Sequence, residues 1–333
     1  MRHENCRWIA QTAMALAVAG AGCQACQGDI KGPPGEPFTT DNYPLVDGST
    51  SLLPLARVIA CELFGLSYES VAGIGDEGIS EIVPQSSSGQ ELELADWIKA
   101  HIVHNKTHQA YLNLVDGAVD LILVANPPSP EEAAYAAAAG VSLDQREIGL
   151  DALVMLANQI NPVSTLTDDQ IRAIFLGEIT SWSSVTAFIG NIHPFVRPTN
   201  SGSQQLMDAI VMQGQTIPTW PEGAPQGGVT RSVGTMGGLV MSVKFDAQAL
   251  GYSVYYYVTH QYPPGGFHLV AVNGIWPTAL TIATRMYPFT APVWVIVRKD
   301  LDPASTAYRM RDWLLTPEGQ DVVARSGYVK LSL

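Results

Sequence analysis

Apolar and polar positions along this chain follow two different periods. Short apolar runs of strand length occur at residues 120–125, 150–158 and 293–298, and a Tyr-rich run occurs at 251–258. Between these runs, apolar residues recur at the three- and four-residue spacing of a helix face. Strands that alternate with amphipathic helices predict an α/β architecture. The helices are expected at residues 54–64, 107–115, 130–140, 168–175, 201–213, 236–245 and 308–315.

Local signals predict where several of these helices begin and end. Thr107 and Thr167 stand where a side-chain oxygen caps the first turn of a helix, and Gly117 and Gly177 follow the last turns. Residues 98–104 read as a strand. Residues 74–97 show neither period and look like an insertion.

The N-terminal segment has the pattern of a targeting signal. Arg2 and Arg7 precede a run of apolar and small residues that ends at Cys23 and is too short to span a membrane comfortably. We expect residues 1–22 to be a signal peptide of the lipoprotein type, with Cys23 as the lipid attachment site. Gly20 stands where such sites usually have Leu or Val, so ordinary secretion or an uncleaved anchor remain alternatives. Residues 23–43 are rich in Gly and Pro and predict a flexible tether.

The charge of the chain limits what it binds. The formal net charge is −13, and removal of residues 1–22, with two Arg and one Glu, changes it to −14. Such an acidic chain predicts neither a nucleic-acid partner nor attraction to an anionic membrane, so membrane contact would come through the lipid anchor only. Any bound anion must be held by local dipoles and by one or two cations.

Three loops carry the chemistry that holds an anion. Arg197 stands four residues before the cluster 201–203, which is expected to open a helix. A helix N-terminus presents free N–H groups and a partial positive charge, so Arg197 beside it favours an oxyanion. The segments 47–51 and 105–107 have similar chemistry and also precede apolar periodic runs. If the three loops converge, they form an anion-binding cleft.

Other polar residues are better explained by structure. His101, His104 and His108 fall on different faces of the predicted elements, so the sequence predicts no metal site and no cofactor. Asp47 could orient its loop or accept a ligand proton, and we favour the structural role.

The chain resembles the phosphate-binding proteins of bacterial phosphate ABC transporters, of the type II periplasmic solute-binding superfamily. The segment 161–182, NPVSTLTDDQIRAIFLGEITSW, carries the resemblance most clearly. Further matching motifs lie at residues 46–50, 106–111, 197–204, 234–238 and 313–320. The resemblance implies an α/β fold of two lobes, joined by two crossing strands that form a hinge. By the same resemblance, residues 44–148 and 260–333 would form lobe 1 and residues 149–259 would form lobe 2.

The resemblance also implies which residues bind the ligand. Transferred position by position, the set comprises Ser49, Thr50, Ser51, the backbone N–H of Leu52, Thr107, Asn126, Arg197, Ser201, Gly202 and Ser203. One position departs from the family pattern, because Asn126 stands where phosphate binders usually have a carboxylate. A carboxylate accepts the proton of hydrogen phosphate, whereas an amide can accept or donate. We therefore hypothesise that the chain excludes sulfate less strictly than its relatives.

The implied function is that of an extracytoplasmic lipoprotein that captures inorganic phosphate or a related tetrahedral oxyanion. It would deliver the anion to an ABC transporter permease, act as a monomer and catalyse no reaction. Two alternatives remain: a phosphate-sensing or interaction lipoprotein without transport, and an extracytoplasmic phosphatase with a serine nucleophile in residues 200–204.

Overall fold

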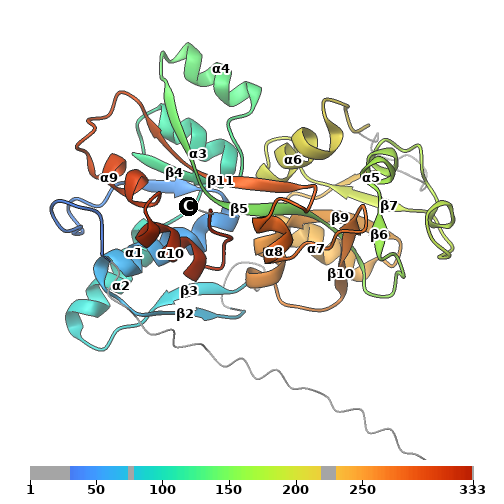
Figure 1. Ribbon diagram of the computed structural model, residues 1–333, viewed down its shortest axis with the longest axis horizontal. Coiled ribbons are helices and arrows are strands. Elements are labelled where there is room, and N and C mark those ends of the chain that lie inside the picture. The colour runs from blue at the N-terminus through green and yellow to red at the C-terminus, as the bar shows by residue number, and fades with distance from the viewer. Residues whose placement is uncertain (1–30, 74–78, 219–229, 332–333) are drawn as a thin grey trace, which may run out of the picture. The chain divides into compact units, whose positions relative to one another are not determined.

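The computed structural model describes residues 31–73, 79–218 and 230–331. Figure 1 shows these residues as a ribbon. The predicted signal peptide and Cys23 lie outside the described residues, and so does most of the predicted tether. Their assignment stays a prediction from the sequence.

A mixed sheet of nine described strands forms the centre of the fold (Figure 1). The strands are β1 (Val46–Gly48), β4 (Leu121–Val124), β5 (Leu143–Asn158), β6 (Thr165–Leu166), β7 (His193–Val196), β8 (Arg231–Ser232), β9 (Ala249–Val254), β10 (Phe267–Val272) and β11 (Thr290–Arg298). The main order is β1-β4-β11-β5-β9-β7-β8, with β10 paired to β5 and β6. Parallel pairs at both ends and antiparallel pairs in the middle make this the α/β fold that the residue pattern predicts.

Strands β5 and β11 connect the two ends of the sheet. They pair antiparallel along all of β11, while β4 pairs with the far side of β11 and β9 with β5. Every residue of β5 from Ile148 to Asn158 is buried, which is typical of a strand covered on both faces. We call the elements on the β1 and β4 side the first lobe and those on the β9, β7 and β8 side the second lobe.

Helices surround the sheet in both lobes (Figure 1). The first lobe has α1 (Leu53–Phe64), α2 (Gly89–His101), α3 (Lys106–Val115), α4 (Pro130–Ala138), α9 (Thr306–Trp313) and α10 (Pro317–Arg325), with the small sheet of β2 (Tyr68–Val71) and β3 (Glu81–Pro84). The second lobe has α5 (Asp168–Phe175), α6 (Gly202–Leu206), α7 (Met236–Phe245) and α8 (Ala279–Ala283). Helix α6 continues directly into a π-helical turn, Met207–Met212.

Some predicted boundaries are confirmed and others are wrong. Helix α5 begins after Thr167, whose side chain accepts a hydrogen bond from the Gln170 N–H in a reciprocal capping box. Helix α3 instead begins at Lys106, so Thr107 lies within its first turn and does not cap it. The strand predicted at residues 98–104 is wrong, because residues 98–101 end helix α2 and residues 102–104 form neither helix nor strand. Helix α2 begins with a capping box of Ser88 and Glu91, inside the stretch that showed no period.

The observed packing places part of the chain in a different lobe from the one that the sequence predicts. The sequence predicts that residues 260–333 belong to the first lobe. Strand β10, however, pairs with β5 and β6, and residues of β10 and α8 share one buried core with β7, β9, α5 and α7. Residues 267–283 therefore pack in the second lobe, and the chain returns to the first lobe only through β11.

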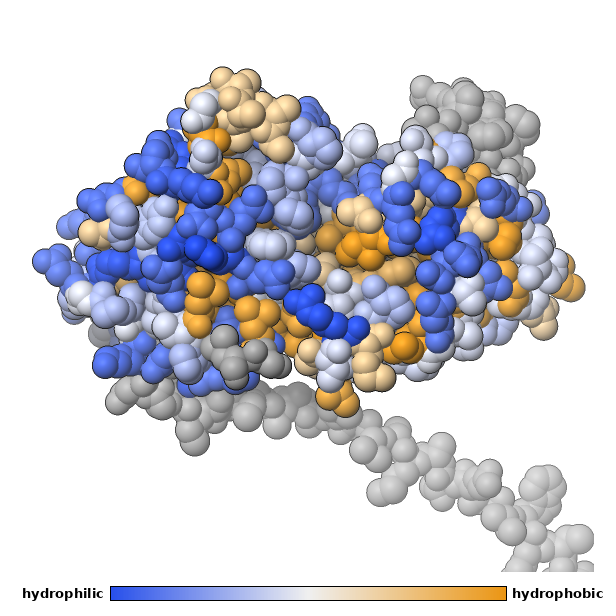
Figure 2. All heavy atoms as spheres, turned by 45° about the horizontal axis from the view of Figure 1, so that its top comes forward, coloured by the Kyte–Doolittle hydropathy of each residue, from blue (hydrophilic) through white to orange (hydrophobic). Residues whose placement is uncertain are grey.

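One face of the molecule is shown as spheres in Figure 2. On the face shown in Figure 2, hydrophilic residues predominate, and the light patch at the upper left lies over α4, whose alanines 133, 134 and 137 are exposed. In the part of the chain that the structure describes, no helix combines the length and the apolar character needed to cross a membrane.

Candidate anion-binding site

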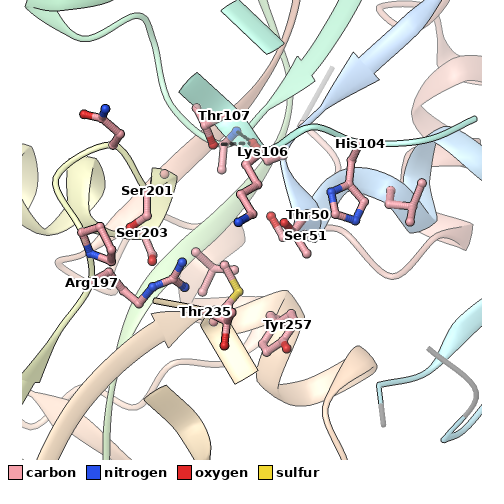
Figure 3. Close-up of a pocket in the computed structure, with 18 of the residues that line it drawn as sticks. Thr50, Ser51, His104, Lys106, Thr107, Arg197, Ser201, Ser203, Thr235 and Tyr257 are labelled. Carbon is pink, nitrogen blue, oxygen red and sulfur yellow. Dashed lines mark hydrogen bonds between the residues drawn. The ribbon is translucent and has the colours of Figure 1, made fainter. Parts of the chain in front are cut away.

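Loops from both lobes enclose a cavity of about 620 Å³. The first lobe contributes the loop between β1 and α1 and the start of α3. The second lobe contributes the loop between β7 and α6, the start of α7 and the residues that follow β9. Figure 3 shows that the labelled hydroxyl, amine and guanidinium groups come from separate loops and gather around this space. The three predicted anion loops do converge.

Asp47 holds the two loops of the first lobe together. Its Oδ1 accepts hydrogen bonds from the backbone N–H of Gly48 and of Asn105, at 2.7 and 2.8 Å. Its Oδ2 accepts from the side-chain amides of Asn105 and Asn113, at 3.0 and 2.7 Å. The side chain is 2% exposed. These contacts give Asp47 the structural role that we favour from the sequence.

Hydroxyl groups from the two loops meet in the cavity wall. Ser49 Oγ lies 3.0 Å from Thr107 Oγ1 and accepts a hydrogen bond from the Ala125 backbone N–H at 3.3 Å. The pair joins the end of β1, the first turn of α3 and the end of β4. The sequence predicted both residues as site residues, and both line the cavity.

Arg197 is the buried cation of the second lobe. It is 8% exposed, and its backbone N–H donates to the Tyr252 hydroxyl at 2.9 Å and to Gln204 Oε1 at 3.0 Å. Its Nη2 donates to the Gly234 carbonyl at 3.2 Å, and the guanidinium points into the cavity (Figure 3). These contacts fix the position of Arg197 at the cavity.

The segment after Arg197 brings further polar groups to the cavity. Ser201 Oγ caps α6 by accepting a hydrogen bond from the Gln204 N–H at 3.2 Å. Ser203 is 3% exposed, and its Oγ has no hydrogen-bond partner among the described residues. A buried hydroxyl without a partner is costly unless a ligand group or a water supplies one. Ser203 therefore indicates where a polar ligand atom belongs.

The family model of a PBP superfamily domain matches residues 73–318. The chain belongs to the PBP superfamily.

Among curated proteins, the phosphate-binding protein PstS of Borreliella burgdorferi (strain ATCC 35210) is 22% identical over 180 residues. That match covers 54% of this chain and 63% of the relative, so it spans less than two thirds of that protein.

Solved structures share the fold of this PBP superfamily member. A substrate-binding protein assigned to a phosphate ABC transporter of Clostridium perfringens, solved with bound phosphate, has a TM-score of 0.58 and 19% identity, over 86% of this chain and 98% of that chain. An ABC-type phosphate transport receptor from Vibrio cholerae has a TM-score of 0.56 and 17% identity, over 85% and 98%. At these identities the likeness shows the fold alone.

Further residues line the cavity that were not predicted as site residues from the sequence. Lys106 adopts a positive φ of 69°, uncommon for a residue with a side chain, and its amine points into the cavity from a different side than Arg197 (Figure 3). His104, Thr235 and Tyr257 line the cavity as well. Lys106 could have been found in the sequence, since it lies inside the Asn105–Thr107 loop.

Two predicted site residues do not line the cavity. The Leu52 backbone N–H donates to the Ser49 carbonyl at 2.9 Å, and Leu52 is 1% exposed. This N–H is therefore already used inside the turn before α1, and the prediction for Leu52 is wrong. Asn126 lies behind the wall, where its Oδ1 is near the position that a Cβ on Gly202 would occupy.

The amide of Asn126 has a defined orientation. Asn126 Nδ2 donates to the Pro127 carbonyl at 3.2 Å and to Gln205 Oε1 on the opposite lobe. Gln205 Nε2 donates in turn to Glu132 Oε1 at 3.1 Å. Asn126 is 4% exposed, and its Oδ1 has no hydrogen-bond partner among the described residues.

Among the described residues, no group of three or more His, Cys, Asp or Glu side chains is placed to hold a metal ion. His108 lies 3.1 Å from Glu132 through its Nδ1, and this contact joins α3 to α4.

Proposed function

We propose that the protein captures inorganic phosphate, or a related tetrahedral oxyanion, in the cavity between its lobes. The observation that carries this proposal is the meeting of Arg197, the Ser203 hydroxyl and the hydroxyl-rich loop 49–51 around one space. Among the residues that the structure describes, the Ser203 hydroxyl has no hydrogen-bond partner. These groups are hydrogen-bond donors from both lobes, as a multiply charged oxyanion requires. The names of the related binding proteins agree with this proposal.

In this proposal each group has a distinct role. The Arg197 guanidinium supplies the buried positive charge, and the Lys106 amine supplies a second one from the start of α3. Thr50, Ser51 and Ser203 donate through their hydroxyls, and the first turn of α6 donates through backbone N–H groups. Micromolar affinity needs only about 8 kcal/mol, which several charge-assisted hydrogen bonds can provide.

Asn126 does not itself line the cavity, but its Oδ1 lies 3.2 Å from where a Cβ on the lining residue Gly202 would be, and we propose that an anion bound at Gly202 reaches this acceptor. The Asn126 Nδ2 is occupied, so the atom left over is the carbonyl Oδ1, which can accept but not donate. An unpaired acceptor beside Gly202 favours an anion that still carries a proton, as hydrogen phosphate does, over sulfate, which carries none at neutral pH. This orientation argues against the relaxed selectivity that the Asn at this position suggested from sequence.

We further propose that the protein works outside the cytoplasm, held to a membrane through lipid on Cys23, and passes its ligand to an ABC transporter permease. The support is the signal-type pattern of residues 1–22 and the transporter context named for the related proteins. Replacement of Cys23 by Ser should release the protein from the membrane fraction. Equal membrane retention of the two forms would contradict the anchor.

The binding proposal is tested by titrating the purified protein with phosphate in a calorimeter, with Arg197→Ala as the paired variant. We expect saturable binding by the wild type and a severe loss in the variant. Absence of phosphate binding by a folded wild-type protein would contradict the proposed function.

A further inference from the structure

The cavity is much larger than a single tetrahedral anion. Its volume of about 620 Å³ lies in the range of pockets that hold drug-sized ligands and corresponds to roughly twenty water volumes. The donors assigned to the anion make up only part of the lining. The other lining residues and the size of the cavity need an explanation.

An open arrangement of the lobes does not supply that explanation. At the anion end the lobes already meet, because a Cβ on Gly202 of the second lobe would collide with Thr107 Oγ1 of the first. Hydrogen bonds from Asn126 to Gln205 and from Gln205 to Glu132 also join the lobes there. The lobes are therefore in contact beside the anion donors, so a separation of the lobes there does not account for the volume.

Part of the cavity wall is apolar and aromatic. Leu53 at the start of α1 and Met236 at the start of α7 line it and are half-buried, so their surfaces are available to a ligand. Val254 and Tyr257 form its buried floor, each 1% exposed. Figure 3 shows Tyr257 on the far side of the space from Ser201 and Ser203. An apolar wall is stabilised by an apolar ligand group that displaces water from it.

We propose that the cavity binds a monosubstituted phosphate, a phosphate monoester or a phosphonate, whose tetrahedral head lies at Arg197 and Ser203 and whose apolar substituent packs on Leu53, Met236 and Tyr257. This inference rests on the proposed function, since it uses the same anion subsite. It extends the ligand class from the bare anion to anions that carry an organic group.

A carboxylate in the cavity wall favours an uncharged substituent over a second phosphate group. Glu81 lines the cavity, and its Oε2 receives a hydrogen bond of 2.7 Å from Arg57. A second anionic group that approached this carboxylate would be repelled by it, and Arg57 is already paired with the carboxylate. Pyrophosphate is therefore the informative competitor.

The experiment titrates the purified wild-type protein with inorganic phosphate, phenylphosphonate and pyrophosphate at one pH and ionic strength. We expect saturable binding of phosphate and phenylphosphonate and weaker binding of pyrophosphate. Binding of phosphate without phenylphosphonate would overturn this inference and leave the proposed function intact. Binding of pyrophosphate in preference to phenylphosphonate would also overturn it. Binding of phenylphosphonate without phosphate would support the inference while contradicting the bare-anion function, and binding of neither would contradict both.

Two cavity-filling variants then locate the substituent. Met236→Trp and Leu53→Trp should each weaken phenylphosphonate binding about tenfold or more, while phosphate affinity changes by less than about threefold. Met241→Trp is the matched control, because Met241 lies on the same helix as Met236, is 41% exposed and does not line the cavity. Thermal unfolding of each variant verifies its fold. An equal loss of both ligands in the two folded variants, or no loss of either, would overturn the placement.

Discussion

Gln205 Nε2 donates a hydrogen bond to Glu132 Oε1 across 3.1 Å and so joins the second lobe to the first. A carboxylate can only accept, so this contact fixes which end of the Gln205 amide faces Glu132. The opposite end, Oε1, then faces Asn126 and requires the Asn126 NH₂ group as donor. Glu132 thereby determines that Asn126 turns its oxygen, and not its nitrogen, away from Gln205.

Glu132→Gln should reduce the discrimination between phosphate and sulfate. The new amide keeps the capping box with Ser129, in which Glu and Gln are interchangeable. Its NH₂ group can also donate to Gln205 Oε1. The side-chain amides of Gln205 and Asn126 can then both turn, so that the Asn126 NH₂ group no longer donates to Gln205 and can donate to a ligand. We expect the ratio of phosphate to sulfate affinity, measured by calorimetry, to fall about tenfold or more.

Glu131→Gln is the control for this variant, because Glu131 stands beside Glu132 in the first turn of α4 and is exposed. It removes the same charge without touching Gln205. The same change of selectivity in both variants would assign the effect to net charge and refute the role of the amide chain.

Arg197→Ala should weaken phosphate binding by about 30-fold or more, since removal of a buried charged partner typically costs 2–5 kcal/mol. The fold should remain, because the backbone N–H of residue 197 keeps its contacts with Tyr252 and Gln204. Arg231→Ala is the control, as Arg231 lies on β8 outside the cavity lining. Comparable losses of phosphate affinity in the two variants would assign the effect to the change in net charge and not to a specific contact of Arg197 with the anion.

Gly202→Ala should impair binding through its steric effect on the closed lobes. The added Cβ would collide with Thr107 Oγ1, the hydroxyl that pairs with Ser49. We expect weaker phosphate binding with little change in thermal stability. Gly89→Ala, at the first residue of α2 where no atom lies within 4 Å of an added Cβ, should leave both quantities unchanged. Wild-type affinity in Gly202→Ala would show that the lobes need not approach this closely.

Asp151 should make stability fall as pH rises. Burial raises the pKa of its carboxyl to about 7, and hydrogen bonds from the backbone N–H groups of Tyr256 and Ala152 only partly offset this. In the unfolded chain the pKa is about 3.9, so between about pH 4 and pH 7 the folded state retains a proton that the unfolded state has lost. The free energy of unfolding therefore decreases with pH across that window.

Asp151→Asn should remove this dependence, because an amide oxygen can accept the same two backbone hydrogen bonds and does not titrate. Urea unfolding at several values between pH 5 and pH 8 measures the difference. Parallel pH profiles of the wild type and the variant would show that Asp151 titrates alike in the folded and unfolded states.

The sequence predicted elements well where the local signal and the tertiary environment agree. Helix α5 has its Thr167 cap, an acidic first turn and a Gly after its end, and it folds as predicted. The buried strand β4 is similarly clear. The prediction failed at residues 98–101, because a mostly polar helix such as α2 has a weak apolar period, and at β10, whose lobe depends on long-range pairing.

For the site, the chemistry of single loops could be predicted from the sequence, whereas contacts between the two lobes could not. The conjunction of Arg197 with residues 201–203 is local in sequence, so its chemistry could be inferred. The direction of the Asn126 amide depends on Gln205, 79 residues away, and on Glu132 beyond it. No pattern in one sequence reveals such a contact.

The most direct test of the account is calorimetric titration of the purified wild-type protein with phosphate and then with sulfate, at one pH and one ionic strength. The account predicts saturable phosphate binding of micromolar affinity or tighter and no detectable competition by excess sulfate. Binding of sulfate as tight as that of phosphate would contradict the assigned orientation of Asn126, and no binding of either anion would contradict the central claim that this cavity holds a tetrahedral oxyanion.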